Sequence, residues 1–378
     1  MVTSRSANRL EMSATSWENM NRKLYIDGIR GVASVIVLFH HLEQFLVPRN
    51  PAWRSFPFYN FITDGNLAVY VFFVLSGFAL SNDFVISDSI IRLRALAVKR
   101  YFRLTIPILA SLLLPFLLKY FHLFYNEEAG RISSSYWLSV QSKGSYGLVE
   151  TLRFSLYDVY WNFTPDRNLN SNLWTMRPEL LGSFLIFCLL ALTGNNRRRF
   201  LIWIPVAAFF ILNDSFFISF IFGLFLAELS ESKCVAQMRT SYAAFAVAVF
   251  ALGIGAYIIM HSRSLQQSKL VLALFSAGLV FPAVISNRIS WIFETKPALF
   301  LGKLSFPLYL THLTVICTFS SYIYLYLDSH QYWSPATNSL AVLVVTIIVS
   351  FGVATLFAPI ERFAISFSRR MAEYLGTV

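Results

Sequence analysis

Long blocks of mostly apolar residues constrain this chain more than any other feature of its sequence. The blocks cover residues 104–118, 184–192, 200–212, 242–260 and 340–357. A helix needs about 20 mostly apolar residues to cross the hydrocarbon core of a bilayer, and it satisfies its own backbone hydrogen bonds there. Only 13% of the 378 residues are charged, which is about half of what a soluble domain carries. The sequence therefore predicts an all-α, polytopic membrane bundle.

We place ten transmembrane helices on these blocks and on the shorter apolar stretches between them. The predicted ranges are 28–48, 66–82, 104–121, 172–193, 200–213, 214–229, 242–260, 270–286, 304–326 and 336–361. The membrane domain covers residues 24–365, between polar tails at 1–23 and 366–378. Residues 1–23 lack the apolar centre of a signal peptide. Residues 122–171 are expected to form a long polar and aromatic loop at the outer face.

The positions of the basic residues explain the net charge of +11. More than twice as many Lys and Arg residues fall in the predicted tails and inner loops as in the outer loops. The cytoplasmic loops of membrane proteins carry such an excess. This bias predicts that both termini are cytoplasmic and that the chain is a multi-pass protein of the cell membrane, in contact with lipids. Because topology accounts for the charge, nucleic-acid binding is not expected.

The first predicted span carries ionisable residues, which are rare inside a membrane. Arg30 and His41 are three turns plus ~20° apart, so both lie on one face of the helix, ~16 Å apart along its axis. Asp27 lies on the same stripe, whereas His40 points ~80° away from Arg30. Such residues usually face an interior cavity and mark a functional path. Alternatively, Arg30 reaches the lipid headgroups, and the two histidines bond each other and nearby carbonyls.

The fourth predicted span brings an acid to the expected depth of His41. It begins near Asn172, so Glu179 lies about 10 Å below the outer boundary. We therefore predict a catalytic pair in which the carboxylate of Glu179 orients or charges the imidazole of His41, with His40 as a further candidate. Alternatively, Glu179 is a structural carboxylate that pairs with Arg177.

Two other spans carry polar side chains in their interiors. Tyr309 and His312 are three residues apart and therefore neighbours on one helix face. They either take part in a site or make a hydrogen-bonded contact between helices. Ser76 and Gly77 lie inside the second span, where small residues usually indicate close helix packing.

A dense basic group precedes the third span. It includes Lys99, Arg100 and Arg103. Arg100 and Arg103 are three residues apart on a helix that enters the membrane, so together they could hold phosphate groups. The positive-inside bias explains part of this cluster without any ligand.

Six segments of the chain form a recognisable set when they are taken together. They are "IDGIRGVASVIVLFHH" (26–41), "FFVLSGF" (72–78), "KRYFRLTIP" (99–107), "LWTMRPE" (173–179), "LGKLSFPLYLTHLTV" (301–315) and "APIERF" (358–363). In this order they resemble the motifs of the acyltransferase type 3 family of integral membrane acyltransferases. The resemblance extends over about residues 24–365.

The resemblance implies an O-acyltransferase that moves an acyl group, usually acetyl from cytoplasmic acetyl-CoA, to a hydroxyl group. The expected acceptor is a carbohydrate, either a polysaccharide or a lipid-linked glycan, although a macrolide-like molecule or a lipid is an alternative. His41 would be the catalytic histidine, with Arg30 on the donor path and Glu179 nearby. The donor phosphates would bind at the basic group, and no metal is expected. Candidate substrate-binding residues are Ser76, Trp174, Tyr309 and His312.

Other interpretations remain open at this stage. His41 could act as a general base or could carry the acyl group itself. A proton-coupled transporter or flippase would use the same intramembrane residues as a proton relay, and a structural scaffold would leave them without a role. Aromatic residues in the outer loop could stack on sugar rings or form an interfacial belt. These residues are Tyr136, Trp137, Tyr157, Tyr160 and Trp161.

Overall fold

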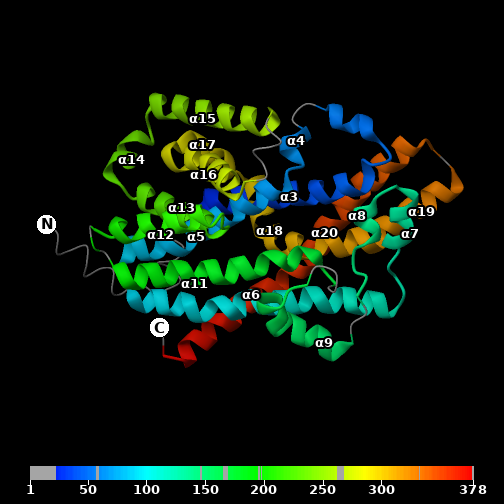
Figure 1. The fold of residues 1–378 in the computed structure, drawn as a ribbon, viewed down its shortest axis with the longest axis horizontal. Helices are drawn as coiled ribbons and strands as arrows, with labels where there is room; N and C mark the ends of the chain where they lie inside the picture. The colour runs from blue at the N-terminus through cyan, green and yellow to red at the C-terminus, as the bar shows by residue number, and fades with distance from the viewer. Residues whose placement is uncertain are drawn as a thin grey trace.

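The computed structural model of the protein is a bundle of α-helices (Figure 1). It describes residues 23–56, 59–144, 147–164, 169–194, 196, 198–261, 268–331 and 333–376, with side chains for all of these except 254–261. No β-strand occurs in these ranges. The all-α prediction is therefore confirmed, while the predicted tail at 1–23 lies outside the described residues apart from Lys23.

Short helices connect the long ones in the first half of the chain. The elements there are α3 (Leu24–Leu46), η1 (Pro51–Ser55), α4 (Tyr59–Ile62), α5 (Gly65–Ser87), α6 (Ile90–Tyr120), α7 (Asn126–Ile132), α8 (Tyr136–Ser139), α9 (Leu148–Arg153), η2 (Phe154–Asp158), α10 (Val159–Trp161), η4 (Ser171–Thr175) and α11 (Met176–Thr193). The predicted outer loop is thus largely helical, because it contains α7 to α10 and the start of η4.

The second half of the chain is helical in the same way. Its elements are α12 (Phe200–Leu212), α13 (Phe217–Ser230), α14 (Lys233–Met238), α15 (Tyr242–His261), α16 (Lys269–Ile285), α17 (Asn287–Phe293), α18 (Lys296–Val315), η6 (Ile316–Ser320), α19 (Ser321–His330) and α20 (Pro335–Tyr374). Each of the ten ranges predicted from the sequence overlaps one of the helical segments.

Five helical segments of the described chain are long and apolar enough to cross a membrane. They are Gly65–Ser87, Ile90–Tyr120, Ser171–Thr193, Lys296–His330 and Pro335–Tyr374. A sixth candidate joins α16 and α17, which meet at an angle of 109°. α12 and α13 have only 13 and 14 residues, fewer than the roughly 20 that a straight crossing needs. The protein is therefore a membrane helix bundle, and the count of ten spans stays a prediction.

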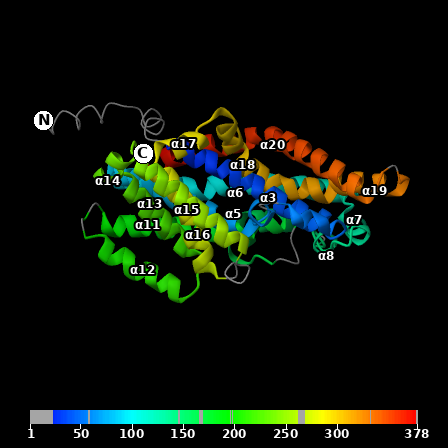
Figure 2. The same ribbon diagram turned by 90° about the horizontal axis from the view of Figure 1, so that it is seen from above.

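Different helices and helix ends lie at the two ends of the bundle. The start of α3 and the end of α20 lie at one end, whereas α7, α8 and α19 lie at the opposite end (Figures 1 and 2). That both termini lie on the same side of the membrane stays a prediction. Which side faces the cytoplasm stays a prediction.

Glycines bring the central helices into backbone contact. Gly77 of α5 faces the carbonyl oxygen of Phe220 on α13, so closely that a Cβ would overlap it. Between α3 and α18, a Cβ on Gly31 would lie 2.5 Å from the backbone nitrogen of Gly302. Small residues permit such approaches in membrane bundles. The packing explanation for the small residues of the second span is thus confirmed for Gly77, and α3 is fixed directly against α18.

Candidate active site

His41 lies close to the C-terminal end of α3, where it meets three other segments. Its Nε2 lies 2.8 Å from Oδ1 of Asn172 in η4. One face of its ring stacks on His312 of α18, with centroids 5.2 Å apart. Its ring also stacks on Trp137 of α8, with centroids 5.0 Å apart. The imidazole is therefore held by contacts from three other elements that are far apart in the sequence.

Nδ1 of His41 differs from the other ring nitrogens in this cluster. It is buried and has no hydrogen-bond partner. His312, in contrast, uses both nitrogens: Nδ1 lies 2.7 Å from the carbonyl oxygen of Leu308, and Nε2 lies 3.1 Å from Nδ2 of Asn172. Buried polar groups are normally satisfied, so an exception calls for an explanation. An imidazole nitrogen kept available for chemistry is such an explanation.

His40, the adjacent candidate, also uses both ring nitrogens. Nδ1 lies 2.7 Å from the carbonyl oxygen of Thr63, and Nε2 lies 2.7 Å from Nε2 of Gln44. Gly65, the first residue of α5, packs against the ring, so that a Cβ there would lie 2.5 Å from its Cγ. His40 thus connects the end of α3 to the start of α5, which is a structural role.

The segment that presents Asn172 is fixed to α18 on both sides. The side-chain amide of Asn170 donates to the carbonyl oxygen of Leu310 at 2.8 Å, and its Oδ1 accepts from the backbone N–H of Asn172. The hydroxyl of Tyr309 donates to the carbonyl oxygen of Asn172 at 2.8 Å. It also lies 2.8 Å from the hydroxyl of Thr175. The predicted helix neighbours Tyr309 and His312 therefore both contact Asn172.

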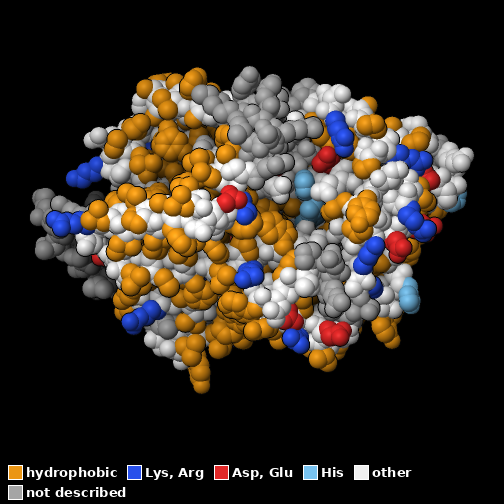
Figure 3. Space-filling view, in the orientation of Figure 1, with side chains coloured by type: hydrophobic (Ala, Val, Ile, Leu, Met, Phe, Trp, Pro, Cys, Tyr) orange, Lys and Arg blue, Asp and Glu red, His pale blue; other side chains and the backbone are white. Residues whose placement is uncertain are grey.

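A small cavity of about 70 Å³ lies beside the imidazoles. It is lined by Val37, His40, His41, Gly65, Asn66, Val69, Asn172, Trp174 and Tyr309. Figure 3 shows histidine side chains in a hollow near the middle of one face of the molecule. The lining combines one indole ring and one phenol ring with amides and imidazoles. Such a lining suits a small polar group that packs against aromatic rings.

Glu179 does not pair with His41, and the predicted catalytic pair is replaced by a different one. Glu179 forms an ion pair with Arg100 of α6, and its Oε1 accepts a 2.5 Å hydrogen bond from Ser76. The alternative pairing with Arg177 is replaced in the same way. The prediction failed because His41 lies only five residues before the end of α3, so Asn172 reaches its level, while Glu179 lies seven residues further along.

The ion pair belongs to an inner polar layer between α5, α6 and α11. Arg100 and Glu179 are only 12% and 14% exposed, and Nε of Arg100 donates to the hydroxyl of Ser183 at 2.7 Å. Nη2 of Arg30 lies 3.4 Å from the carbonyl oxygen of Leu75, next to Ser76. Arg100 is bonded to Glu179 and Ser183 within the protein, and its predicted role with Arg103 toward donor phosphates stays a prediction.

The two other basic candidates, Lys99 and Arg103, lie on the same helix as Arg100. Lys99 is half-buried and Arg103 is exposed on α6. Both interact with other residues of the chain, so their role toward a donor stays a prediction. Among the described residues, no three His, Cys, Asp or Glu side chains are grouped as a metal site requires.

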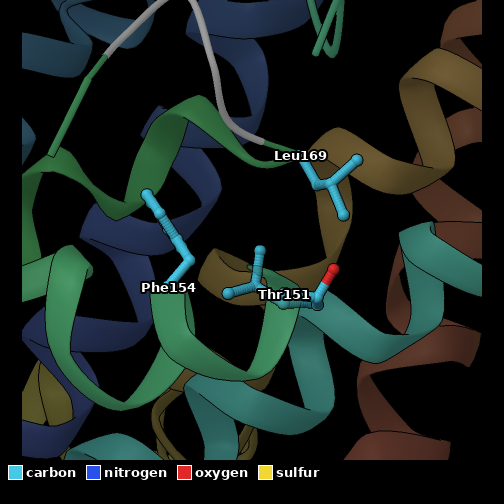
Figure 4. Close-up of a pocket in the computed structure, with 4 residues that line it drawn as sticks. Thr151, Phe154 and Leu169 are labelled. Carbon is cyan, nitrogen blue, oxygen red and sulfur yellow. The ribbon is translucent and has the colours of Figure 1, made fainter. Parts of the chain in front are cut away.

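A second hollow, shown in Figure 4, has a different character. It lies between α6, α9, η2 and the residues before η4, and its lining consists of Leu112, Thr151, Phe154 and Leu169. It has no room for a water molecule. The hydroxyl of Thr151 donates to the carbonyl oxygen of Gly147 at 3.0 Å. This crevice is a packing gap and offers no group for chemistry.

Asn172 and Trp137 are the residues that sequence reasoning missed at the site. From the sequence, Asn172 marks only the start of a predicted span, and Trp137 is one of several aromatic residues in a predicted loop. No signal from spacing could connect them to His41, because they lie 131 and 96 residues away along the chain. The run "NLNSNLW" at 168–174 is rich in asparagine, which is its one visible indication.

Comparison with known proteins places the chain in a family. Searches of curated proteins and of solved structures gave no match. A family model described as an acyltransferase domain matches residues 23–355. The match covers the helices that surround His41, Asn172 and His312, and it includes five of the six motif segments completely. The chain therefore belongs to the acyltransferase type 3 family of membrane acyltransferases.

Proposed function

We propose that this protein is an O-acyltransferase that moves a small acyl group, acetyl in the first place, from cytoplasmic acyl-CoA to a hydroxyl of a carbohydrate acceptor on the other side of the membrane. One observation carries the proposal. The imidazole of His41 is held on two faces and at Nε2, while its buried Nδ1 has no partner. An oriented imidazole with one available nitrogen is suited to proton transfer near neutral pH.

The proposed reaction uses His41 as a general base. The acceptor oxygen forms a bond to the carbonyl carbon of the thioester, and the carbon–sulfur bond breaks. Nδ1 of His41 takes the hydroxyl proton and returns it to the leaving thiolate, so the products are the ester and the free thiol of CoA. Such proton transfer contributes typically 10²–10⁴-fold to a rate. Direct acylation of His41 is the alternative, and a burst of acyl-enzyme formed without acceptor would indicate it.

The size of the cavity supports a short acyl group. A cavity needs roughly 10–15 Å³ of such space to hold one water molecule, so about 70 Å³ has room for only a few. An acetyl group fits this space, whereas a long chain would need another path. The indole of Trp174 and the phenol of Tyr309 line the same cavity, and aromatic rings of this kind suit the apolar face of a sugar.

The donor would approach from the end of the bundle where α3 begins and α20 ends. Lys99 and Arg103, which lie on either side of Arg100 along α6, supply positive charge for the phosphates of CoA. Between that end and the cavity lies the inner polar layer with Arg30, Arg100 and Glu179. We propose that the pantetheine arm passes this layer on its way to His41, in the cell membrane with both termini cytoplasmic.

Thiol release from acetyl-CoA is the test of this function. Purified protein in nanodiscs is supplied with acetyl-CoA and a crude glycan extract, and free CoA thiol and acetylated glycan are measured. Wild type is expected to release thiol, and His41→Gln is expected to lose at least a hundredfold. His330→Gln, which changes an exposed histidine of α19, is the matched control and should retain the activity.

The same assay distinguishes an acyltransferase from a transporter or flippase. A transporter or flippase would use the same residues for proton movement and would release no thiol. Binding of acetyl-CoA without thiol release in any acceptor extract would therefore contradict the acyltransferase proposal. Equal release by wild type and His41→Gln would remove His41 from the reaction.

A further inference from the structure

We infer that Asn172 is a positioning residue that fixes the proton of His41 on Nε2 and thereby makes Nδ1 the reactive nitrogen. The inference rests on the proposed function, and it adds a defined atom to it. The evidence is an unbroken row of hydrogen bonds that runs from the backbone of α18 through His312 and Asn172 to His41. In this row, the donor and acceptor of each hydrogen bond determine the donor and acceptor of the next one.

The row begins at the carbonyl oxygen of Leu308, which can only accept a hydrogen bond. Nδ1 of His312 lies 2.7 Å from it and must therefore carry a proton. His312 is fully buried, at 0% exposure, among an amide, a carbonyl and aromatic rings. Burying a charge in such surroundings costs far more than burying a neutral ring. His312 is thus neutral, and its Nε2 is an acceptor.

The hydrogen bond to His312 fixes the orientation of the Asn172 side-chain amide. Because Nε2 of His312 accepts, the group that faces it at 3.1 Å must be the Nδ2 amide of Asn172, which donates. The opposite orientation of the side-chain amide would require a second proton on buried His312. Oδ1 of Asn172 consequently faces His41, and this oxygen can only accept.

The last bond assigns the tautomer of His41. Its Nε2, 2.8 Å from Oδ1 of Asn172, must donate and therefore carries the proton. In the neutral ring the lone pair then lies on Nδ1, the buried atom that has no hydrogen-bond partner. In isolation, an imidazole exchanges its proton between both nitrogens. Here the amide selects one tautomer and one ring orientation, as the partners of functional histidines commonly do.

The position of Asn172 is itself fixed by its backbone. Its carbonyl oxygen accepts from the hydroxyl of Tyr309, and its N–H donates to Oδ1 of Asn170. The amide therefore cannot swing away from His41 without breaking contacts to α18. This explains why Tyr309 and His312, which lie one turn apart on the same helix face, are both placed against Asn172.

The test compares three variants in the thiol-release assay. Asn172→Leu removes both side-chain hydrogen bonds at a similar size, and we expect kcat to fall roughly tenfold to hundredfold, the range seen when the partner that orients a functional histidine is removed. KM for acetyl-CoA should change much less. Thr175→Val is the matched control. It removes a hydroxyl that donates to the backbone carbonyl oxygen of Asn172 at 3.1 Å and lies 2.8 Å from the hydroxyl of Tyr309, so it loosens the same segment and leaves the side-chain bonds of the row in place.

The pH profile of Asn172→Asp distinguishes a positioning role of this residue from a merely structural one. Aspartate keeps the acceptor toward Nε2 of His41 but adds a negative charge, which stabilises the imidazolium. The rising limb of the pH profile of kcat should therefore move to higher pH by about one unit or more. His40 and His312 also contact His41, so the shift is compared with that of Thr175→Val, which should show none.

A double variant tests whether the row acts as a unit. Asn172→Leu combined with His312→Leu should lose little more kcat than Asn172→Leu alone, since both interrupt the same row of hydrogen bonds and the leucine at 312 keeps an apolar group against the face of the His41 ring. Wild-type kcat and an unmoved pH limb in both Asn172 variants, with His41→Gln inactive, would overturn this inference and leave the proposed function intact. Should Asn172→Leu fail to fold, the pH limb of Asn172→Asp decides alone. Wild type without thiol release would overturn the proposed function itself.

Discussion

His41 and Asn172 lie 131 residues apart in the chain, and a hydrogen bond of 2.8 Å joins their side chains. The bond connects the end of α3 to the short segment η4 that precedes α11. It leaves His41 with one satisfied and one unsatisfied ring nitrogen. Of the two adjacent histidines, His40 thus makes structural contacts with both ring nitrogens, and His41 keeps one nitrogen available for chemistry.

Replacing Gly65 by alanine should disturb the site through His40. The added Cβ would lie 2.5 Å from Cγ of the His40 ring, and overpacking of this kind costs roughly 1–3 kcal/mol. We expect a lower midpoint of thermal unfolding and reduced thiol release. Gly352→Ala in α20 is the control, because nothing lies within 4 Å of the added atom. Equal midpoints for both variants would show that His40 can move freely.

The ion pair of Arg100 and Glu179 should be structural. Breaking a buried pair leaves one charge without a counter-ion and costs roughly 3–5 kcal/mol. Glu179→Gln and Arg100→Gln should each lower the unfolding midpoint and the yield of active protein, and the double variant should recover part of both losses. A double variant as inactive as Glu179→Gln, yet stable, would instead assign Glu179 to the reaction.

Arg103 should contribute to donor binding and not to the chemical step. Removing one charge-assisted hydrogen bond of about 1.4 kcal/mol raises a dissociation constant roughly tenfold. Arg103→Gln should therefore raise KM for acetyl-CoA by up to this factor, with kcat unchanged and a weaker dependence on salt. Arg131→Gln in α7, at the opposite end of the bundle, serves as the control. The same increase in both variants would exclude a local donor site on α6.

The acyl group that the enzyme accepts should depend on the volume beside His41. Wild type should prefer acetyl-CoA over butyryl-CoA, because one misfitting methylene group costs roughly tenfold or more in kcat/KM. Val37→Ala enlarges the lining of the cavity and should narrow this preference. Val342→Ala, an equally buried valine of α20 outside the cavity, should leave the ratio unchanged. An unchanged ratio in Val37→Ala would place the acyl group elsewhere.

The topology can be tested with cysteines at the two ends of the bundle. Cys188 and Cys234, which are exposed, are first replaced by alanine. Tyr136→Cys in α8 should react with a membrane-impermeant thiol reagent in intact cells, and Tyr374→Cys at the end of α20 only after permeabilisation. Both positions are more than 80% exposed. The reverse pattern would contradict the predicted cytoplasmic termini.

Much of the fold could be predicted from the sequence, because helix formation in a membrane depends on local composition. Each of the ten predicted ranges overlaps a helix, although α6 begins well before residue 104 and α20 continues well beyond 361. These ends are polar enough to fall outside an apolar block, yet they remain helical. Composition alone also does not decide how many of the helices cross the membrane, since α12 and α13 are short.

The contacts of the site were harder to predict because they depend on how far the helices are shifted along their axes relative to one another. The sequence placed Glu179 and His41 at one level, and a shift of about seven residues was enough to bring Asn172 there instead. Asparagine gave no warning of its role, since polar residues near a predicted helix start are common. Trp137 lay in a loop whose path over the bundle no local pattern specifies.

The backbone contact between Gly31 and Gly302 has a consequence for how a substrate could reach the site. His41 and His312 are carried by the two helices that this contact joins, so the distance between the imidazoles is set by main chain against main chain and not by yielding side chains. The pair α3–α18 therefore behaves as one rigid wall. Because η4 is itself hydrogen-bonded to α18, we expect any widening that admits an acyl donor or an acceptor at α8, which rests against His41 through the ring of Trp137.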